Sequence, residues 1–147
     1  MKGAVLDASV LVAVLSPDEI HHAGAKRLYA TLPSGVAYWV PAVFRLEVVA
    51  ALSRRERPAA TMEKARTLVG SARFDPVAID AVLIDRASEI ASTAGLRAYD
   101  ALYAAVASMR SVPLVTLDRD VARRLREARS AVVVISLDPD AVGRPRA

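Results

Sequence analysis

Four acidic residues lie in stretches of sequence that are otherwise apolar, where an ionised carboxylate needs a partner. The four acids are Asp7, Glu47, Asp100 and Asp118. Asp7 is the clearest case, because it interrupts the apolar segment 4–15 and is the only charged residue between Lys2 and Asp18. Taking an unpaired carboxylate out of water is costly, and only a cation, a metal ion or converging hydrogen-bond donors offset that cost. The four positions are therefore candidates for one shared site.

Four converging carboxylates would form a site made of oxygen ligands only. Such a hard ligand set suits Mg²⁺ or Mn²⁺ better than zinc or copper. The chain has no cysteine, and its two histidines, His21 and His22, are adjacent and would point in different directions on a helix. The chemistry that this site predicts is phosphodiester hydrolysis, in which a metal-activated water attacks phosphorus while the ion stabilises the leaving oxygen.

Each acid also has a structural interpretation when it is considered alone. Asp100 and Asp118 each open a predicted helix and can cap it, and for Asp118 alone capping is the more natural interpretation. Glu47 can pair with a buried arginine. Asp7 has no capping role that Ser9, two residues later, does not already offer. Taken together, the four acids favour a functional site over four unrelated structural roles.

The elements that must position these acids alternate between short apolar strands and longer helices. The predicted strands are 3–6, 36–40, 74–78, 114–117 and 132–135. The predicted helices are 10–16, 19–31, 41–55, 61–71, 80–95, 101–109 and 119–129. Ser9 is expected to cap the first helix, Pro41 to lie in the first turn of the third, and Gly95 to stop the fifth. Pro76 marks its strand as an edge strand, because proline cannot donate to a ladder.

This alternation predicts an α/β fold, with a mostly parallel sheet of four to five strands flanked by helices on both faces. In such sheets the ligand site lies beyond the carboxyl ends of the strands, at a point where the strand order reverses. Asp7 and Asp118 both follow a predicted strand. Glu47 shares a helix face with Val43 and Ala50, so its carboxylate should emerge from an apolar surface into the core or a cleft.

Four segments carry the acids in a specific order along the chain. They are 5–9, 41–47, 99–105 and 114–120. In that order they resemble the four acidic motifs of the PIN-domain family, and the VapC-like toxin ribonucleases of type II toxin-antitoxin systems are the most similar members. The resemblance predicts a single PIN-like nuclease domain over residues 1–137, followed by a polar and flexible C-terminal tail over 138–147.

The resemblance implies an endoribonuclease that depends on Mg²⁺ or Mn²⁺ and hydrolyses RNA. Members of this kind are usually homodimeric and are neutralised by a small VapB-like antitoxin whose C-terminal segment enters the active-site groove. By correspondence with the family motifs, Asp7 and Asp100 are expected to be the principal metal ligands. Glu47 is expected to be a ligand or the base that orients the attacking water.

The resemblance also assigns supporting positions. Asp118 is expected to be a second-site ligand or an outer-shell acceptor, although Asp120 stands two residues later and is an alternative fourth acid. The position directly after the strand favours Asp118. Ser9 and Thr116 match small hydroxyl positions that would orient Asp7.

The basic residues are dominated by arginine, at 17 of 20, and the net charge is +4. Arginine favours bidentate contacts to phosphate or carboxylate, so the partners are expected to be anionic. Arg45 and Arg97 lie near acidic motifs and are expected to contact RNA phosphates or acidic groups of the antitoxin, as are the arginines within 54–57. For 54–57 a solvated helix end is an equally good interpretation.

Length and composition narrow the class of protein. A chain of 147 residues with 54% hydrophobic content predicts one domain with a packed core. The absence of cysteine suits a reducing cytoplasm. The longest uncharged run, 28–44, contains two prolines and a glycine, and Asp7 sits where a signal peptide would be apolar. Neither export nor a membrane span is therefore expected.

Other functions fit the sequence less well. A phosphoaspartate receiver domain needs a lysine after a late strand, and all three lysines lie elsewhere. A dehalogenase-like phosphatase needs a second aspartate where Ser9 stands. The remaining alternative is a non-catalytic PIN-like interaction module, in which the acidic cluster holds a structural ion or an arginine from a partner chain.

Overall fold

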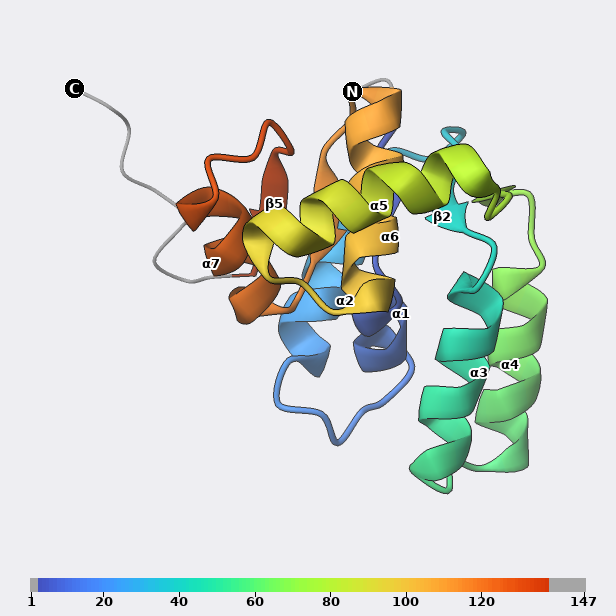
Figure 1. Cartoon of the computed structure of the whole chain (residues 1–147). Helices are drawn as coiled ribbons and strands as arrows, with labels where there is room; N and C mark the ends of the chain where they lie inside the picture. The colour runs from blue at the N-terminus through green and yellow to red at the C-terminus, as the bar shows by residue number, and fades with distance from the viewer. Residues whose placement is uncertain (1–2, 138–147) are drawn as a thin grey trace.

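Residues 3–137 are described by the computed structural model, and they form one parallel sheet of five strands with helices on both faces (Figure 1). The strands are β1 (Val5–Leu6), β2 (Tyr38–Pro41), β3 (Phe74–Val77), β4 (Leu114–Thr116) and β5 (Val134–Ser136). Both residues of β1 are fully buried, as expected for a central strand covered on two faces. The predicted α/β fold with a parallel sheet is confirmed.

The strand order reverses at β1, since the order across the sheet is β3-β2-β1-β4-β5. The chain runs outward from β1 to β3 and then returns to the other side of β1 for β4 and β5. β1 and β4 are neighbours, with Val5 opposite Leu114 and Leu6 opposite Val115. Their carboxyl ends therefore open at the switch point, where sheets of this kind bind ligands. Asp7 follows β1 directly, and Asp118 follows β4 after one residue.

Within residues 3–137, seven helices connect and cover the strands. They are α1 (Ala8–Val14), α2 (His22–Thr31), α3 (Phe44–Arg54), α4 (Ala59–Val69), α5 (Ala81–Ala94), α6 (Ala98–Arg110) and α7 (Arg119–Glu127). α6 packs on β1, β2 and β4, and α5 packs on α6. α3 and α4 stand as an antiparallel pair beside the sheet (Figure 1).

α6 is the helix most deeply embedded in the core. Every residue from Ala101 to Ala107 is buried, and four of these seven residues are alanines. Small side chains let a helix approach the sheet closely, while Tyr103 is the bulkiest of the buried side chains on this helix. Because this helix is fixed against β1, the residues of its first turn are held at the carboxyl edge of the sheet.

Several local predictions are confirmed. α5 begins after Asp80, whose carboxylate accepts a hydrogen bond from the backbone nitrogen of Leu83 at 2.9 Å. It ends at Gly95, which adopts φ +65°, a left-handed conformation that favours glycine. β3 is an edge strand and contains Pro76, which leaves no ladder bond unmade on the open side.

Two predictions about helix starts are wrong. Pro41 is the last residue of β2, paired with Val77, and α3 begins only at Phe44. Proline at a strand end costs no ladder bond, so pairing with β3 extends the strand past the predicted boundary. Ser9 lies inside the first turn of α1 and Asp7 occupies the N-cap position without a capping bond from its side chain. The Ser9 hydroxyl bonds to Asp7 instead.

Other element bounds shift by a few residues. α2 begins at His22, because residues 17–21 form turns rather than the predicted helical start at residue 19. Over residues 3–137, none of the helices has the length and apolarity that a membrane span requires. The predicted flexible tail, 138–147, falls outside the described residues.

Candidate active site

A cleft of about 520 Å³ opens at the switch point between β1 and β4. All four predicted acids line it, and they come from four separate segments of the chain. The acids are Asp7, Glu47, Asp100 and Asp118. Each is partly buried. The cleft is bounded on one side by Val43, which precedes α3, and by Ala50 and Ala51 on α3.

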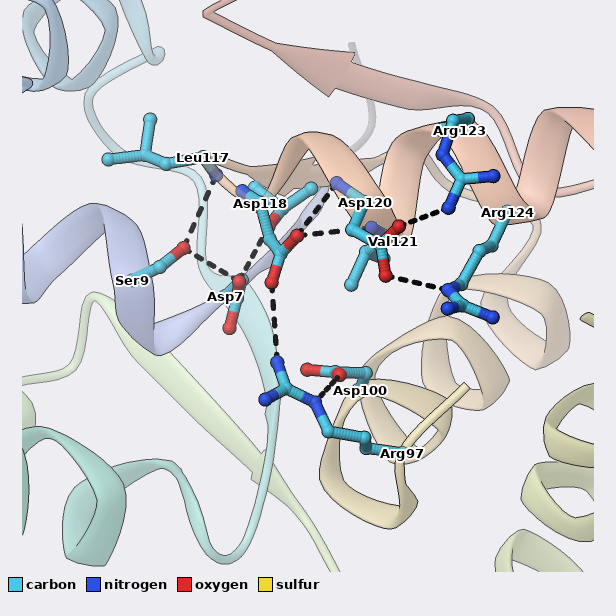
Figure 2. Close-up of polar contacts among 11 residues, drawn as sticks. Asp7, Ser9, Arg97, Asp100, Leu117, Asp118, Asp120, Val121, Arg123 and Arg124 are labelled. Carbon is cyan, nitrogen blue, oxygen red and sulfur yellow. Dashed lines mark hydrogen bonds and ion pairs between the residues drawn. The ribbon is translucent and has the colours of Figure 1, made fainter. Parts of the chain in front are cut away.

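Asp7 is held by two hydroxyl groups that both donate to its Oδ2. Ser9 Oγ lies 2.7 Å away and Thr116 Oγ1 lies 2.6 Å away. Each hydroxyl also accepts from a backbone nitrogen after β4. Leu117 donates to Ser9 at 3.2 Å (Figure 2). Asp118 donates to Thr116 at 3.1 Å. A hydroxyl has one proton to donate. Because each hydroxyl oxygen already accepts from a backbone N–H, its own proton is directed towards the carboxylate of Asp7.

The environment of Asp7 disfavours its charge despite these donors. Burial raises the pKa of Asp7, the hydrogen bonds from Thr116 and Ser9 oppose that rise, and the negative charge of Asp100 adds to it. Both hydroxyls bind Oδ2, so Oδ1 is left free of them. An added cation near Oδ1 would therefore relieve an unfavourable charge.

Glu47, on α3, is paired with a tyrosine from α6. The hydroxyl of Tyr103 donates to Glu47 Oε2 across 56 residues of sequence. Burial raises the pKa of Glu47, the Tyr103 hydrogen bond opposes this, and the charges of Asp7 and Asp100 raise it further. Burial also raises the pKa of Tyr103, which therefore stays a donor. This tyrosine was not predicted as a site residue, although it lies one helical turn after Asp100.

Arg97 joins the other two acids. Its Nε donates to Asp100 Oδ2 at 3.0 Å, and its Nη2 donates to Asp118 Oδ2 at 3.4 Å (Figure 2). Arg97 occupies the N-cap position of α6, and Asp100 lies in the first turn. The alternative interpretation of Asp100 as the cap of its own helix is therefore wrong.

The two oxygens of Asp118 have different partners. Oδ1 accepts from the backbone nitrogens of Asp120 at 2.8 Å and Val121 at 3.1 Å, which caps α7 as the structural interpretation of this residue predicts. Oδ2 faces Arg97 and the cleft. Asp120 instead binds Arg123 and Arg124 of its own helix, the latter at 2.6 Å. Of the two candidates for the fourth acid, Asp118 is the one that lines the cleft.

The arginines near the acidic motifs are divided between two places. Arg54, Arg55 and Arg97 line the cleft, and Arg55 forms an ion pair with Glu19. Arg45 lines a different hollow, formed by the end of β2 and by α4. Arg45 and Glu47 are two positions apart on α3, which corresponds to a rotation of about 200° around the helix axis. Their side chains therefore point to opposite sides of the helix.

The donor chemistry of the cleft fits a hydrated divalent cation. Within the described range 3–137, no group of three or more His, Asp or Glu residues is arranged as a ready metal cage. Mg²⁺ does not require one, because it keeps several waters and is often bound by one or two carboxylates together with substrate phosphate. The charges of Asp7 and Asp100 interact, and both also interact with the charge of Glu47, so these three acids lie close together in the cleft.

Comparison with known proteins identifies the fold. The family model described as PIN domain matches residues 4–128. No curated protein matches the sequence significantly.

Solved structures resemble the chain over most of its length. VapC20 of Mycobacterium tuberculosis, a sarcin-ricin loop cleaving toxin, has a TM-score of 0.71 at 21% identity, covering 82% of this chain and 94% of that one. FitAcB from Neisseria gonorrhoeae has a TM-score of 0.65 at 17% identity, with coverages of 91% and 97%. VapBC2 from Rickettsia felis, bound to a promoter DNA fragment, has a TM-score of 0.63 at 14% identity, with coverages of 92% and 98%. The family match, the switch-point cleft and its four acids agree, and the chain belongs to the PIN-domain family.

Proposed function

We propose that this protein is a metal-dependent endoribonuclease that hydrolyses RNA phosphodiesters and is the toxin of a VapBC-type toxin-antitoxin pair. One observation supports the proposal above all: four acids from distant segments line a single cleft at the carboxyl edge of the sheet. Four neighbouring carboxylates repel one another, which raises the free-energy cost of keeping them ionised. A purely structural role does not require that cost, whereas binding a cation offsets it.

In the proposed mechanism, Asp7 and Asp100 would hold the cation, and Asp118 Oδ2 would be an additional or outer-shell acceptor. The divalent ion, when bound, supplies Lewis acidity at the phosphate and lowers the pKa of a coordinated water. Thr116 and Ser9 keep Asp7 in one orientation by binding its Oδ2, and Oδ1 is proposed as the atom that would bind the ion.

Glu47 is proposed as the group that accepts a proton from the attacking water. A general base works best when its pKa approaches the working pH, and burial already raises the pKa of Glu47 in that direction. Tyr103 fixes the carboxylate by binding Oε2, which leaves Oε1 for the water. Arg54, which lines the cleft, is proposed to contact the flanking RNA phosphates, and Arg55 could do so on release from its ion pair with Glu19.

The partners form part of the same proposal. Solved relatives include toxin-antitoxin assemblies, such as VapBC2 from Rickettsia felis, and this supports a VapB-like antitoxin as the cognate inhibitor. A homodimer is proposed as the working assembly. A cytoplasmic location is part of the same proposal, since a cellular RNA target would be met there. Arg45 stays a predicted contact for RNA or antitoxin outside the acidic cleft.

The test is cleavage of single-stranded RNA with Mg²⁺ or Mn²⁺, with EDTA, and with the Asp7→Asn and Asp100→Asn variants. We expect loss of cleavage in EDTA and a fall of at least about a hundredfold in each variant, the scale on which catalytic groups contribute. Asp85→Asn is the matched control, since Asp85 is an exposed acid on α5 outside the cleft. Cleavage that survives both cleft substitutions would rule out the catalytic assignment.

A second candidate function is a non-catalytic module whose acids hold an arginine of a partner chain. The contacts of Asp100 and Asp118 with Arg97 favour it, because they demonstrate that this cleft accepts a guanidinium group. A purified protein that binds its partner through the cleft but leaves RNA intact in Mg²⁺ and Mn²⁺ would support this alternative.

A further inference from the structure

The guanidinium group of Arg97 lies between two of the four acids, where a cation is expected. It contacts Asp100 Oδ2 and Asp118 Oδ2 at 3.0 and 3.4 Å (Figure 2). Its side chain is 81% exposed, so it reaches these oxygens from the mouth of the cleft and does not pack in the core. The two acids with which it pairs are much less exposed, at 21% and 29%.

Helix stability does not explain an arginine at this position. Arg97 is the N-cap residue of α6 and makes no capping hydrogen bond with its side chain. The N-terminus of a helix carries a partial positive charge, so a cation there is unfavourable. Its contacts with Asp100 and Asp118 are what offset this cost.

Arg97 contacts oxygen atoms of two acids that a divalent cation in the cleft could also use. Asp118 Oδ1 is committed to the first backbone N–H groups of α7, which leaves only Oδ2 for a ligand in the cleft. That atom is the one Arg97 contacts. Arg97 also contacts one of the two oxygens of Asp100. A metal ion and Arg97 therefore compete for shared atoms.

We propose that Arg97 is an internal counter-ion of the acidic cleft, which a divalent cation displaces from Asp100 and Asp118 when it binds. This inference rests on the proposed metal-dependent function. Arg97 neutralises the two acids while the metal is absent and thereby sets the affinity of the cleft for the ion. Exposed arginine–carboxylate pairs are weak, so the displacement lowers metal affinity by a modest factor, about threefold to tenfold.

The test is a titration of the full-length protein with Mn²⁺, following free Mn²⁺ by electron paramagnetic resonance. Arg97→Met removes the charge and every side-chain donor while keeping an unbranched apolar stem. We expect it to bind Mn²⁺ about threefold to tenfold more tightly than the native protein, because both Oδ2 atoms become available. If Arg97 instead held the acids in a productive arrangement, Mn²⁺ affinity would fall, and the proposal would be overturned.

A matched variant separates competition from a general effect of charge. Arg54 lines the same cleft but forms no ion pair with the acids within residues 3–137. Arg54→Met removes the same charge and should leave Mn²⁺ affinity within about twofold of the native value, since exposed charges that make no direct contact are screened. Equal tightening in both variants would overturn displacement in favour of simple electrostatics.

A further measurement observes the arginine itself. The Nε–H resonance of Arg97, assigned by its absence in Arg97→Met, should shift when Mg²⁺ is added to the native protein, and should stay in place in Asp100→Asn. An unchanged resonance in a protein that binds Mg²⁺ would overturn the inference alone. Absence of any Mn²⁺ or Mg²⁺ binding by the native protein would overturn the metal-dependent function and this inference with it.

Discussion

Thr116 donates a hydrogen bond to Asp7 across 109 residues of sequence, and this single contact joins the carboxyl ends of β4 and β1 at the candidate active site. The two strands are neighbours only because the strand order reverses at β1. The Thr116 hydroxyl at the same time accepts from the backbone nitrogen of Asp118, which places the fourth acid. One side chain therefore positions two of the four acids.

Replacing Thr116 with valine should damage both stability and activity. Valine has nearly the same shape, so the change removes the hydroxyl and leaves Asp7 with one donor fewer and the Asp118 nitrogen without its acceptor. Leaving buried polar groups without partners costs about 1–3 kcal/mol, and urea unfolding of the metal-free protein measures this. Thr116→Ser retains the hydroxyl and should keep most of the activity. A valine variant as stable and active as the native protein would contradict the assigned role.

Asp7→Asn should stabilise the metal-free protein at neutral pH. The pKa of Asp7 is raised in the folded state, mainly by burial, so between its ordinary value of about 3.8 and the folded value the native state binds more protons than the unfolded state. The contribution of Asp7 to the free energy of unfolding is therefore fully present below the ordinary pKa, and it is lost as the pH rises through this window. Asparagine carries no charge and should abolish that part of the pH dependence.

The measurement is the melting temperature in EDTA between pH 4 and pH 8. The native protein should lose stability with increasing pH relative to Asp7→Asn, and the two curves should converge at the acidic end. A variant that is less stable than the native protein at every pH would indicate that the Asp7 carboxylate is needed by the fold rather than tolerated by it.

Mg²⁺ should raise the melting temperature of the native protein more than that of Asp100→Asn. A ligand that binds only the folded state stabilises it by about 2.7 kcal/mol at a concentration of a hundred times its Kd. Removing one of the charges that attract the ion should shrink the shift. Thermal melts with 0 and saturating Mg²⁺ measure it, with Ca²⁺ as a comparison ion. Equal shifts in both proteins would argue against binding at the four acids.

Tyr103→Phe should move the acidic limb of the pH–rate profile to higher pH. The Tyr103 hydrogen bond lowers the pKa of Glu47, opposing burial, so its loss lets that pKa rise further. If Glu47 is the general base, lowering the pH then protonates it at a higher pH in the variant than in the native protein. The fall in kcat/KM on the acidic side should therefore begin at a higher pH. Tyr29→Phe is the control, because the Tyr29 hydroxyl is buried without a partner among the described residues. A profile that drops uniformly, without a shift, would point to a structural role for Tyr103.

Much of the fold was predictable from local sequence, because the relevant signals act over a few residues. Asp80 and Gly95 set the ends of α5 through capping and left-handed backbone, and Pro76 marked an edge strand through its missing N–H. The apolar strands alternating with helices gave the parallel sheet. The positions of Asp7 and Asp118 after strands predicted that they would face the ligand edge.

The interactions inside the site depended on tertiary structure. Glu47 and Tyr103 are joined only because α3 and α6 meet at the sheet, and nothing within either helix predicts that pair. Arg97 reaches Asp118 because α6 and α7 begin at the same edge. The chain by itself determined which acids were anomalous and where their elements end, since these depend on local propensity and hydropathy. The strand order and helix packing decided which oxygens face the cleft and which cation already contacts them, since those contacts join residues far apart in sequence.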